Sequence, residues 1–250
     1  MSLRVALVTG SGKKRVGAAV ADRLARAGYA VAVHYRTSAS EAAQTVSQLK
    51  SHGVAAQAFP ADLSEEASVK KLVADVIAAF GRIDVLVNCA AVWQSKRLED
   101  VTAADVRLHF DTNALGTFLM CQHVGLRMVS QPEGGVIVNV GDWAEVRPYL
   151  HYAAYFPSKG AVTAITKTLA VELGTRNPKV RVNQVSPGPV MLPPDLPQSE
   201  RDEAVRGTLV KREGSPANVA AAVLSLVEND FITGAVLPVD GGRSVYAAEG

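Results

Sequence analysis

The sequence predicts an α/β protein built on one doubly wound parallel sheet of about seven strands, with helices on both faces. Short β-branched runs alternate with longer segments of helical period along the 250 residues, and such repeated alternation is typical of βαβ units. Runs such as VALV, DVLV and VIVNV are apolar at every position, as expected of strands that helices cover on both sides. No internal repeat, low-complexity segment or linker interrupts the pattern, so we predict a single domain over residues 1–250.

Seven apolar runs are predicted strands, and six segments of helical spacing lie between them. The predicted strands are Val5–Val8, Ala30–Tyr35, Ala55–Pro60, Val85–Asn88, Val136–Val140, Val180–Val185 and Ala235–Val239. The predicted helices are Gly17–Ala27, Ser40–Ser51, Glu65–Phe80, Ala103–Val129, Ala153–Leu173 and Pro216–Val227. The alternation stops at Ser186–Gly207, which is rich in proline. Because long loops in compact domains are usually functional, we expect a substrate loop near residues 187–210, with a passive surface loop as the alternative.

Composition is typical of a globular protein and excludes several other classes. With 48% apolar and 20% charged residues the chain can bury a substantial core, and its net charge of +2 is too small for a nucleic-acid surface. Cys89 and Cys121 lie in apolar runs, which indicates reduced thiols. The N terminus has no signal-peptide pattern and no run is long enough to span a bilayer. We therefore expect a cytoplasmic protein without membrane or nucleic-acid partners.

A glycine-rich turn, TGSGKKRVG, follows the first predicted strand and is a candidate phosphate site. Gly10, Gly12 and Gly17 let the backbone approach a phosphate at the N terminus of the next helix. From this turn Lys14 and Arg15 can reach either the pyrophosphate or a 2′-phosphate of a dinucleotide. The spacing matches neither a P-loop nor Gly-x-Gly-x-x-Gly, so the position of the turn after the first strand is the stronger part of this evidence.

The end of the second predicted strand indicates which cofactor is used. NAD-binding folds normally place an acidic residue there, which binds the ribose hydroxyls. The segment HYRTSAS contains no acid between His34 and Ser40. Arg36 and Ser38 stand where a 2′-phosphate would lie, so the sequence predicts NADPH rather than NADH. The alternative is that these are solvated surface charges.

Tyr155 and Lys159 are the candidate catalytic pair. They are four residues apart on a predicted helix and therefore share one face. An ammonium beside a phenol stabilises the phenolate and lowers its pKa, which makes the phenol a usable proton donor or acceptor. Tyr149 and Tyr152 have no lysine at this spacing.

The chain resembles the short-chain dehydrogenase/reductase family over essentially its whole length. The matching motifs are the glycine cluster at Thr9–Gly17, ADL at Ala61–Leu63, VNCAA at Val87–Ala91, TNALGTF around Asn113, Tyr155-x-x-x-Lys159, SPGPV at Ser186–Val190 and the closing ITGAVLPVDGG. The resemblance implies a single Rossmann-like domain, a homotetramer and hydride transfer. It implies that Tyr155 donates the proton, that Lys159 binds ribose and lowers the tyrosine pKa, and that Asn113 supports a water relay.

The resemblance also implies an NADPH site made of residues from both halves of the chain. The residues expected to bind the cofactor are Gly10, Lys14, Arg15, Val16, His34, Tyr35, Arg36, Ser38, Asp62, Leu63, Asn88, Ala90, Tyr155, Lys159, Pro187 and Gly188. No metal site is expected, since no group of residues has ligand spacing.

Asp142 departs from the family pattern, which has a serine thirteen residues before the tyrosine. A serine hydroxyl can donate a hydrogen bond to a carbonyl, whereas an ionised aspartate can only accept one. A substrate that carries N–H donors would therefore suit Asp142 better than a simple ketone. The alternative is that Asp142 is a structural cap where a strand meets a loop.

One branch of the family shares this aspartate: the pteridine reductases and their bacterial dihydropterin and dihydrofolate reductase relatives. They also resemble this chain in the Lys-Arg turn, in the His-Tyr end of the second strand and in an aromatic residue at the position of Trp93. We therefore expect NADPH-dependent reduction of a pterin or folate. The residues expected to contact the substrate are Arg15, Trp93, Asp142, Tyr155 and Met191.

Four alternatives to these roles stay open. The protein could be a general carbonyl reductase, for instance of 3-oxoacyl thioesters, or a non-catalytic sensor that binds NADPH. Trp93 could pack against the proline-rich segment rather than stack on a substrate. Arg15 could form a surface salt bridge rather than join cofactor to substrate.

Overall fold

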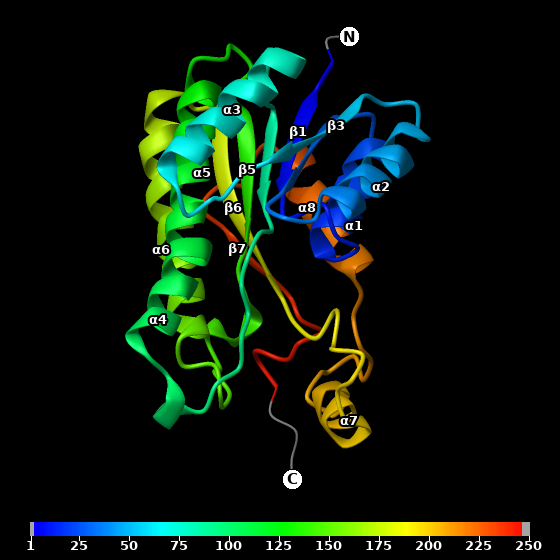
Figure 1. The fold of residues 1–250 in the computed structure, drawn as a ribbon, viewed down its shortest axis with the longest axis vertical. Helices are drawn as coiled ribbons and strands as arrows, with labels where there is room; N and C mark the ends of the chain where they lie inside the picture. Colours follow the sequence, from blue (N-terminus) through cyan, green and yellow to red (C-terminus); the bar gives the residue numbers. More distant parts are fainter. Residues whose placement is uncertain (1–2, 247–250) are drawn as a thin grey trace.

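A seven-stranded parallel sheet forms the centre of the protein in a computed structural model that describes residues 3–246 (Figure 1). The strand order is β3-β2-β1-β4-β5-β6-β7. The strands are β1 Val5–Thr9, β2 Ala30–Tyr35, β3 Ala56–Pro60, β4 Val85–Asn88, β5 Gly135–Val140, β6 Val180–Pro187 and β7 Val236–Val239. The order reverses between β1 and β4, and in sheets of this kind ligands bind outside the carboxyl ends of the strands at that point.

Helices cover both faces of the sheet, so the predicted Rossmann-like fold is confirmed. On one face lie α1 Val16–Arg26, α2 Ala39–Lys50 and α8 Pro216–Glu228; on the other lie α3 Glu66–Phe80, α5 Gly116–Val129 and α6 Tyr155–Arg176 (Figure 1). Leu24 and Val223 belong to the apolar core on the first face, and Leu72 and Met120 to the core on the second. Each fully buried side chain of this size contributes about 1.5–3 kcal/mol. These two cores hold the strand ends in fixed register.

The helix predicted over 103–129 is wrong as a single element. It is divided into α4 Ala103–His109, a π-helical turn η2 Phe110–Leu115, and α5. The wide turn places the Asn113 side chain against Val92 in the loop after β4 and against Ser158 of α6. Such π-turns inside helices frequently occur at functional sites. The break comes from these long-range contacts, which local helical spacing does not reveal.

The proline-rich segment is also more ordered than predicted. β6 continues to Pro187, and the helix α7 Gln198–Arg206 forms within the expected loop. In Figure 1, α7 lies beyond the carboxyl ends of the strands, away from α1 and α8. Arg201 of α7 pairs with Glu213 at 2.9 Å and donates to the Pro193 carbonyl at 2.9 Å. These two contacts hold α7 against the segment that precedes it and the segment that follows it.

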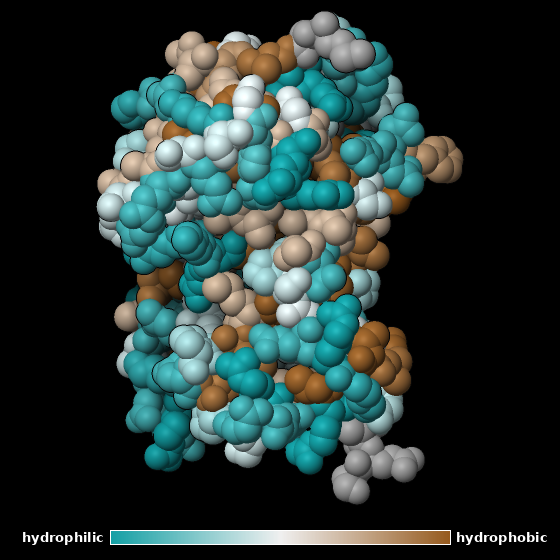
Figure 2. All heavy atoms as spheres, turned by 90° about the vertical axis from the view of Figure 1, so that its right-hand side faces the viewer, coloured by the Kyte–Doolittle hydropathy of each residue, from teal (hydrophilic) through white to brown (hydrophobic). Residues whose placement is uncertain are grey.

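Hydrophilic residues predominate on the face of the protein shown in Figure 2, and the exposed apolar residues on that face form small separate groups. Among the helices within residues 3–246, none combines the length and the apolar character that a membrane span requires.

Candidate active site

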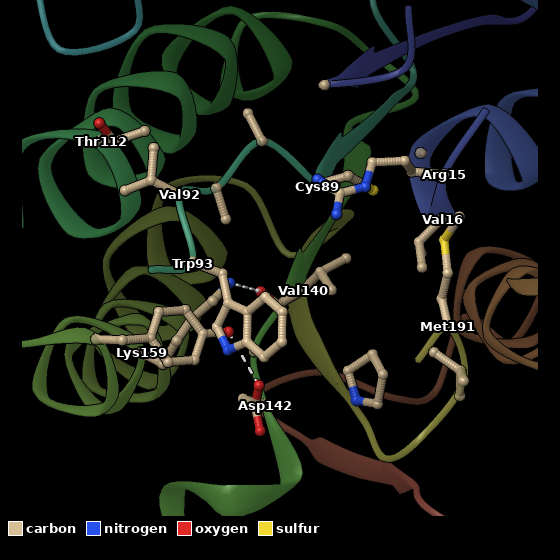
Figure 3. Close-up of a pocket in the computed structure, with 18 of the residues that line it drawn as sticks. Arg15, Val16, Cys89, Val92, Trp93, Thr112, Val140, Asp142, Lys159 and Met191 are labelled. Atoms are coloured by element: carbon tan, nitrogen blue, oxygen red, sulfur yellow. Dashed lines mark hydrogen bonds between the residues drawn. The ribbon is translucent and has the colours of Figure 1, made fainter. Parts of the chain in front are cut away.

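A cavity of about 770 Å³ opens at the carboxyl ends of the central strands. In Figure 3, Trp93 and Lys159 lie on one side of it, and Arg15, Val16 and Met191 lie on the other. Most residues predicted for the site line this cavity. They are Gly10, Arg15, Val16, His34, Tyr35, Arg36, Ser38, Asp62, Leu63, Ala90, Trp93, Asp142, Tyr155, Lys159, Pro187, Gly188 and Met191. The structure therefore brings the expected cofactor and substrate residues together in one space.

Three predicted residues do not line the cavity: Lys14, Asn88 and Asn113. At the glycine-rich turn the lining cations are Lys13 and Arg15 instead. Asn88 is buried within the sheet, where its amide donates to the Asn139 side chain at 2.9 Å. Cys89, the next residue in the sequence, lines the cavity instead. The cofactor-binding roles predicted for Lys14 and Asn88, and the support of a water relay predicted for Asn113, stay predictions.

Asn113 connects three segments behind the cavity wall. Its side-chain oxygen accepts from the Val92 backbone N–H at 2.8 Å, and its amide donates to the Val92 carbonyl and to Ser158 Oγ, both at 3.0 Å. The Ser158 hydroxyl in turn donates to the carbonyl of Tyr155 at 2.6 Å. Asn113 thus fixes both the loop that carries Trp93 and the start of α6.

His34 supports the glycine-rich turn from the second strand. Its Nδ1 accepts from the Gly10 backbone N–H at 3.0 Å, so Nε2 carries the proton and donates to the Ala61 carbonyl at 3.1 Å. Burial lowers the pKa of His34 to about 4, which leaves the ring neutral at pH 7. Gly10 has a φ of +63°, a left-handed conformation that favours glycine. Although His34 lines the cavity, both of its nitrogens are committed to the protein's own backbone.

The residues at the amino end of α1 fit an anionic cofactor. No acidic residue stands in the first turn of α1, whose N terminus carries a partial positive charge. Lys13, Arg15 and Arg36 line this part of the cavity and are exposed. No carboxylate within residues 3–246 lies in ion-pair range of Arg15, whereas Arg36 lies 3.9 Å from Asp62. This donor set suits the phosphates of a dinucleotide, and the salt-bridge alternative for Arg15 has no partner in the part of the chain described.

Tyr155, Lys159 and Asp142 meet at the end of β5. Tyr155 is the first residue of α6, and Pro157 stands in its first turn, where a backbone N–H needs no helical partner. The Tyr155 hydroxyl donates to Asp142 Oδ2 at 2.9 Å. Lys159 Nζ donates to the Val140 carbonyl at 2.7 Å (Figure 3). It lies 6.0 Å from the centre of the Tyr155 ring.

Asp142 also caps a short helix. Its Oδ1 accepts from the Ala144 backbone N–H at 2.9 Å at the start of the 3₁₀ turn η3 Trp143–Glu145. The cap anticipated as an alternative to a chemical role is therefore present. The second carboxylate oxygen nevertheless faces Tyr155, so capping does not withdraw Asp142 from the cavity.

Burial dominates the protonation of this group. It raises the pKa of Tyr155 well above its ordinary value, and the negative charge of Asp142 raises it further. Burial likewise raises the pKa of Asp142 and lowers that of Lys159. Burial and the Asp142 carboxylate therefore set the direction of the Tyr155 pKa in this structure, and the lowering by Lys159 that the resemblance implies stays a prediction.

Aromatic side chains form the wall of the cavity near Asp142. Trp93 stacks on Tyr152, with ring centres 5.0 Å apart and an angle of 10° between the planes, and Tyr149 packs edge-on against Tyr152 at 5.2 Å. Trp93 remains 41% exposed. It therefore packs on a tyrosine and still presents surface to the cavity.

Trp143 and Arg243 are among the lining residues that were not predicted as site residues. Trp143 faces the cavity, and the Arg243 guanidinium lies 4.8 Å from the centre of the Trp143 ring. Arg243 also donates to the Ala204 carbonyl of α7. Because Arg243 is a hundred residues along the chain from Trp143, no local pattern in the sequence indicated the contact.

Comparisons with known proteins agree with this architecture. The family model described as enoyl-(acyl carrier protein) reductase matches residues 11–244. An uncharacterised oxidoreductase of Methylorubrum extorquens is 37% identical over 96% of this chain and 97% of its own length. The short-chain reductase NovJ of Streptomyces niveus is 36% identical over 96% of this chain and 93% of its own.

Solved structures share the fold of this chain over nearly its whole length. A short-chain alcohol dehydrogenase from Sinorhizobium meliloti superposes with a TM-score of 0.90 at 27% identity, covering 97% of both chains. A xylitol dehydrogenase with NAD⁺ bound superposes with a TM-score of 0.88 at 29% identity, covering 96% of this chain and 98% of the other. The family uses NAD(P) and its members are oxidoreductases. With the fold, the Tyr155–Lys159 pair and these matches in agreement, the chain belongs to the short-chain dehydrogenase/reductase family.

Proposed function

We propose that the protein is an NADPH-dependent reductase of a dihydropterin or dihydrofolate. The carboxylate of Asp142 beside the Tyr155 hydroxyl is the observation that carries this proposal. A carboxylate accepts hydrogen bonds and cannot donate them while ionised, so it matches a ring with N–H or NH₂ groups. The stacked aromatic pair of Trp93 and Tyr152 suits a flat ring, which would take the free face of Trp93.

The protonation of Tyr155 suits its proposed role as the proton donor. Since its pKa is raised above the ordinary value, the phenol keeps its proton at neutral pH. A protonated phenol can donate to a substrate atom that receives a hydride, but it cannot act as a base. Asp142 holds the hydroxyl in place until donation, and the aromatic wall excludes water from it. When bound, the nicotinamide supplies the hydride.

Arg36 and the residues around it support NADPH over NADH. The end of β2 offers an exposed guanidinium with Ser38 two residues further on. The carboxylate of Asp62 lies 3.9 Å from the guanidinium of Arg36. It partly balances the positive charge of Arg36 and leaves the guanidinium exposed. A guanidinium binds a phosphate through paired hydrogen bonds, which a ribose hydroxyl does not need.

Carbonyl reduction is the second candidate function. Relatives at 32–36% identity include a 3β-hydroxysteroid dehydrogenase of Eggerthella lenta and a D-threitol dehydrogenase of Mycolicibacterium smegmatis. In such a reaction the Tyr155 hydroxyl would turn from Asp142 to donate to the carbonyl oxygen. Asp142 would then add no donor to that oxygen, which makes this candidate the weaker one.

NADPH consumption by the purified protein tests the proposal. The substrates run in parallel are a dihydropterin, a dihydrofolate and an acetoacetyl thioester, with Tyr155→Phe as the inactive control. We expect turnover of the pterin or folate, and a loss of about 10²–10⁴-fold in kcat in the Phe variant, the usual contribution of a positioned acid. Turnover of the thioester alone would refute the pterin assignment and leave Tyr155 as the donor.

A further inference from the structure

Glu145 is a half-buried carboxylate behind Asp142, and it does not line the cavity. Its Oε1 accepts from the Asp142 backbone N–H at 2.9 Å and from the Gln184 amide at 3.2 Å. Its Oε2 accepts from the Thr163 hydroxyl. Within residues 3–246 no lysine, arginine or histidine forms an ion pair with Glu145. Each hydrogen-bond partner of this carboxylate is therefore uncharged.

The contacts of Glu145 complete a clamp on the turn that carries Asp142. On one side of the turn, Lys159 donates to the Val140 carbonyl at 2.7 Å. On the other side, Glu145 receives the Asp142 N–H. Both clamping residues are anchored on α6, Lys159 directly and Glu145 through Thr163. Because α6 also begins with Tyr155, one helix sets the positions of the phenol, the ammonium and the aspartate.

Gly141, at the centre of the clamp, shows how closely the network is packed. A Cβ at position 141 would lie 2.6 Å from Glu145 Oε1 and still nearer to Gln184 Nε2. Gln184 is fully buried on β6 and also donates to Thr163 and Ser186. The carboxylate of Glu145 therefore has a fixed place against the backbone of the turn.

Charge gives Glu145 a second effect on the site. Buried Lys159 faces two carboxylates, Asp142 and Glu145, and both favour its charged form against the effect of burial. The other ionisable groups around it are Cys89, whose pKa burial raises to about 12, and Tyr155. Both of these are neutral at pH 7. Glu145 thus supplies one of the two negative charges that stabilise the Lys159 ammonium.

We propose that Glu145 is a positioning residue, which fixes the turn that presents Asp142 to Tyr155 and supplies the second negative charge facing Lys159. It acts through Asp142 and Lys159 and touches neither substrate nor cofactor. The proposal holds for any substrate that Tyr155 protonates, so it extends beyond the choice between a pterin and a ketone.

Glu145→Gln and Glu145→Ala separate the two effects. The Gln variant keeps an oxygen for the Asp142 N–H but removes the charge, while the Ala variant removes both. Glu172→Gln is the matched control, because Glu172 is exposed on α6 and pairs with Arg176. The first readout is the titration of Lys159 by NMR in protein labelled with ¹³C-lysine, with the signal assigned from Lys159→Arg. The second is kcat with the best substrate found above.

Removing a nearby anion destabilises an ammonium, so we expect the Lys159 titration midpoint to fall by about one pH unit in Glu145→Gln. The control should titrate as the unsubstituted protein does. We expect Glu145→Ala to lower kcat by up to about 10²-fold while NADPH affinity changes less than about twofold, as when a catalytic group is displaced by about 1 Å. If Glu145→Ala fails to fold, Glu145→Gln still decides the electrostatic half through the titration, and Thr163→Val, which removes the anchor of Glu145 on α6, decides the positioning half through kcat.

An unchanged Lys159 midpoint in Glu145→Gln would overturn the electrostatic half of the proposal. An unchanged kcat in a folded Glu145→Ala variant would overturn the positioning half. The titration requires no substrate, so it can succeed even if none of the substrates tested is turned over. Failure of the proposed function and failure of this inference are therefore distinguishable.

Discussion

Replacing Gly141 by alanine should disturb the turn that carries Asp142 and lower both stability and activity. The added Cβ would lie 2.6 Å from Glu145 Oε1, whereas ordinary contacts begin near 3.4 Å. The carboxylate must therefore retreat by about 0.8 Å, and the Gln184 amide by more. A shift of that size breaks or weakens the hydrogen bond between Asp142 N–H and Glu145, which measures 2.9 Å.

The cost can be worked out from that bond. Hydrogen bonds to charged groups contribute about 1.5–3 kcal/mol, so we expect Gly141→Ala to lower the free energy of unfolding by about 2 kcal/mol. For a chain of this length that corresponds to a fall in Tm of about 4–8 °C. Because the Asp142 carboxylate moves with its backbone, kcat should fall by about tenfold or more.

Gly160→Ala is the matched control for this experiment. Gly160 lies in α6 next to Lys159, and a Cβ there would meet nothing within 4 Å. Alanine in a helix is favoured over glycine by about 0.5–1 kcal/mol, so this variant should be as stable as the unsubstituted protein or more so. Thermal unfolding by circular dichroism and NADPH consumption measure the two effects. A Gly141→Ala variant with unchanged Tm and unchanged kcat would refute the reasoning.

Two further predictions concern the cofactor half of the site. Arg36→Ala should weaken NADPH binding by about 10- to 100-fold and leave NADH binding unchanged, since only the 2′-phosphate would lose a charged partner; fluorescence titration with both cofactors checks this, and an equal loss for both would contradict it. His34 has a pKa of about 4 in the folded protein and about 6.5 when unfolded, so the unfolded chain takes up its proton first as the pH falls. Its contribution to stability is complete above pH 6.5 and should decrease by about 2 kcal/mol between pH 7 and 5. Urea unfolding at the two pH values should show this decrease, and it should be absent in His34→Gln; the same decrease in both proteins would contradict the assignment.

The sheet was predictable because each strand is encoded locally. A run such as VIVNV needs no partner to indicate a strand that is covered on both sides, and β5 forms over that run. The same local periodicity failed over 103–129, because the π-turn at Asn113 is stabilised by contacts with Val92 and Ser158, far away in the sequence.

The site was predictable where a motif spaces residues along one element, as with Tyr155 and Lys159 on α6. It was not predictable where the contact crosses the sheet. Glu145 stands three residues after Asp142, a capping-box spacing that could have pointed to it. Arg243 reaches Trp143 from the C-terminal end of the chain, and no spacing in the sequence indicates that contact.

The hydrogen bonds of His34 have a practical consequence for changing the cofactor preference of this enzyme. His34 joins the residues that follow the two strands flanking β2, Gly10 after β1 and Ala61 after β3, and it uses one ring nitrogen for each. A residue that replaces His34 must accept a hydrogen bond from the Gly10 N–H and donate one to the Ala61 carbonyl. Position 34 therefore tolerates few substitutions. Redesign should therefore begin two residues further on, at exposed Arg36, where a side chain can be exchanged without loosening the crevice edge that a dinucleotide needs.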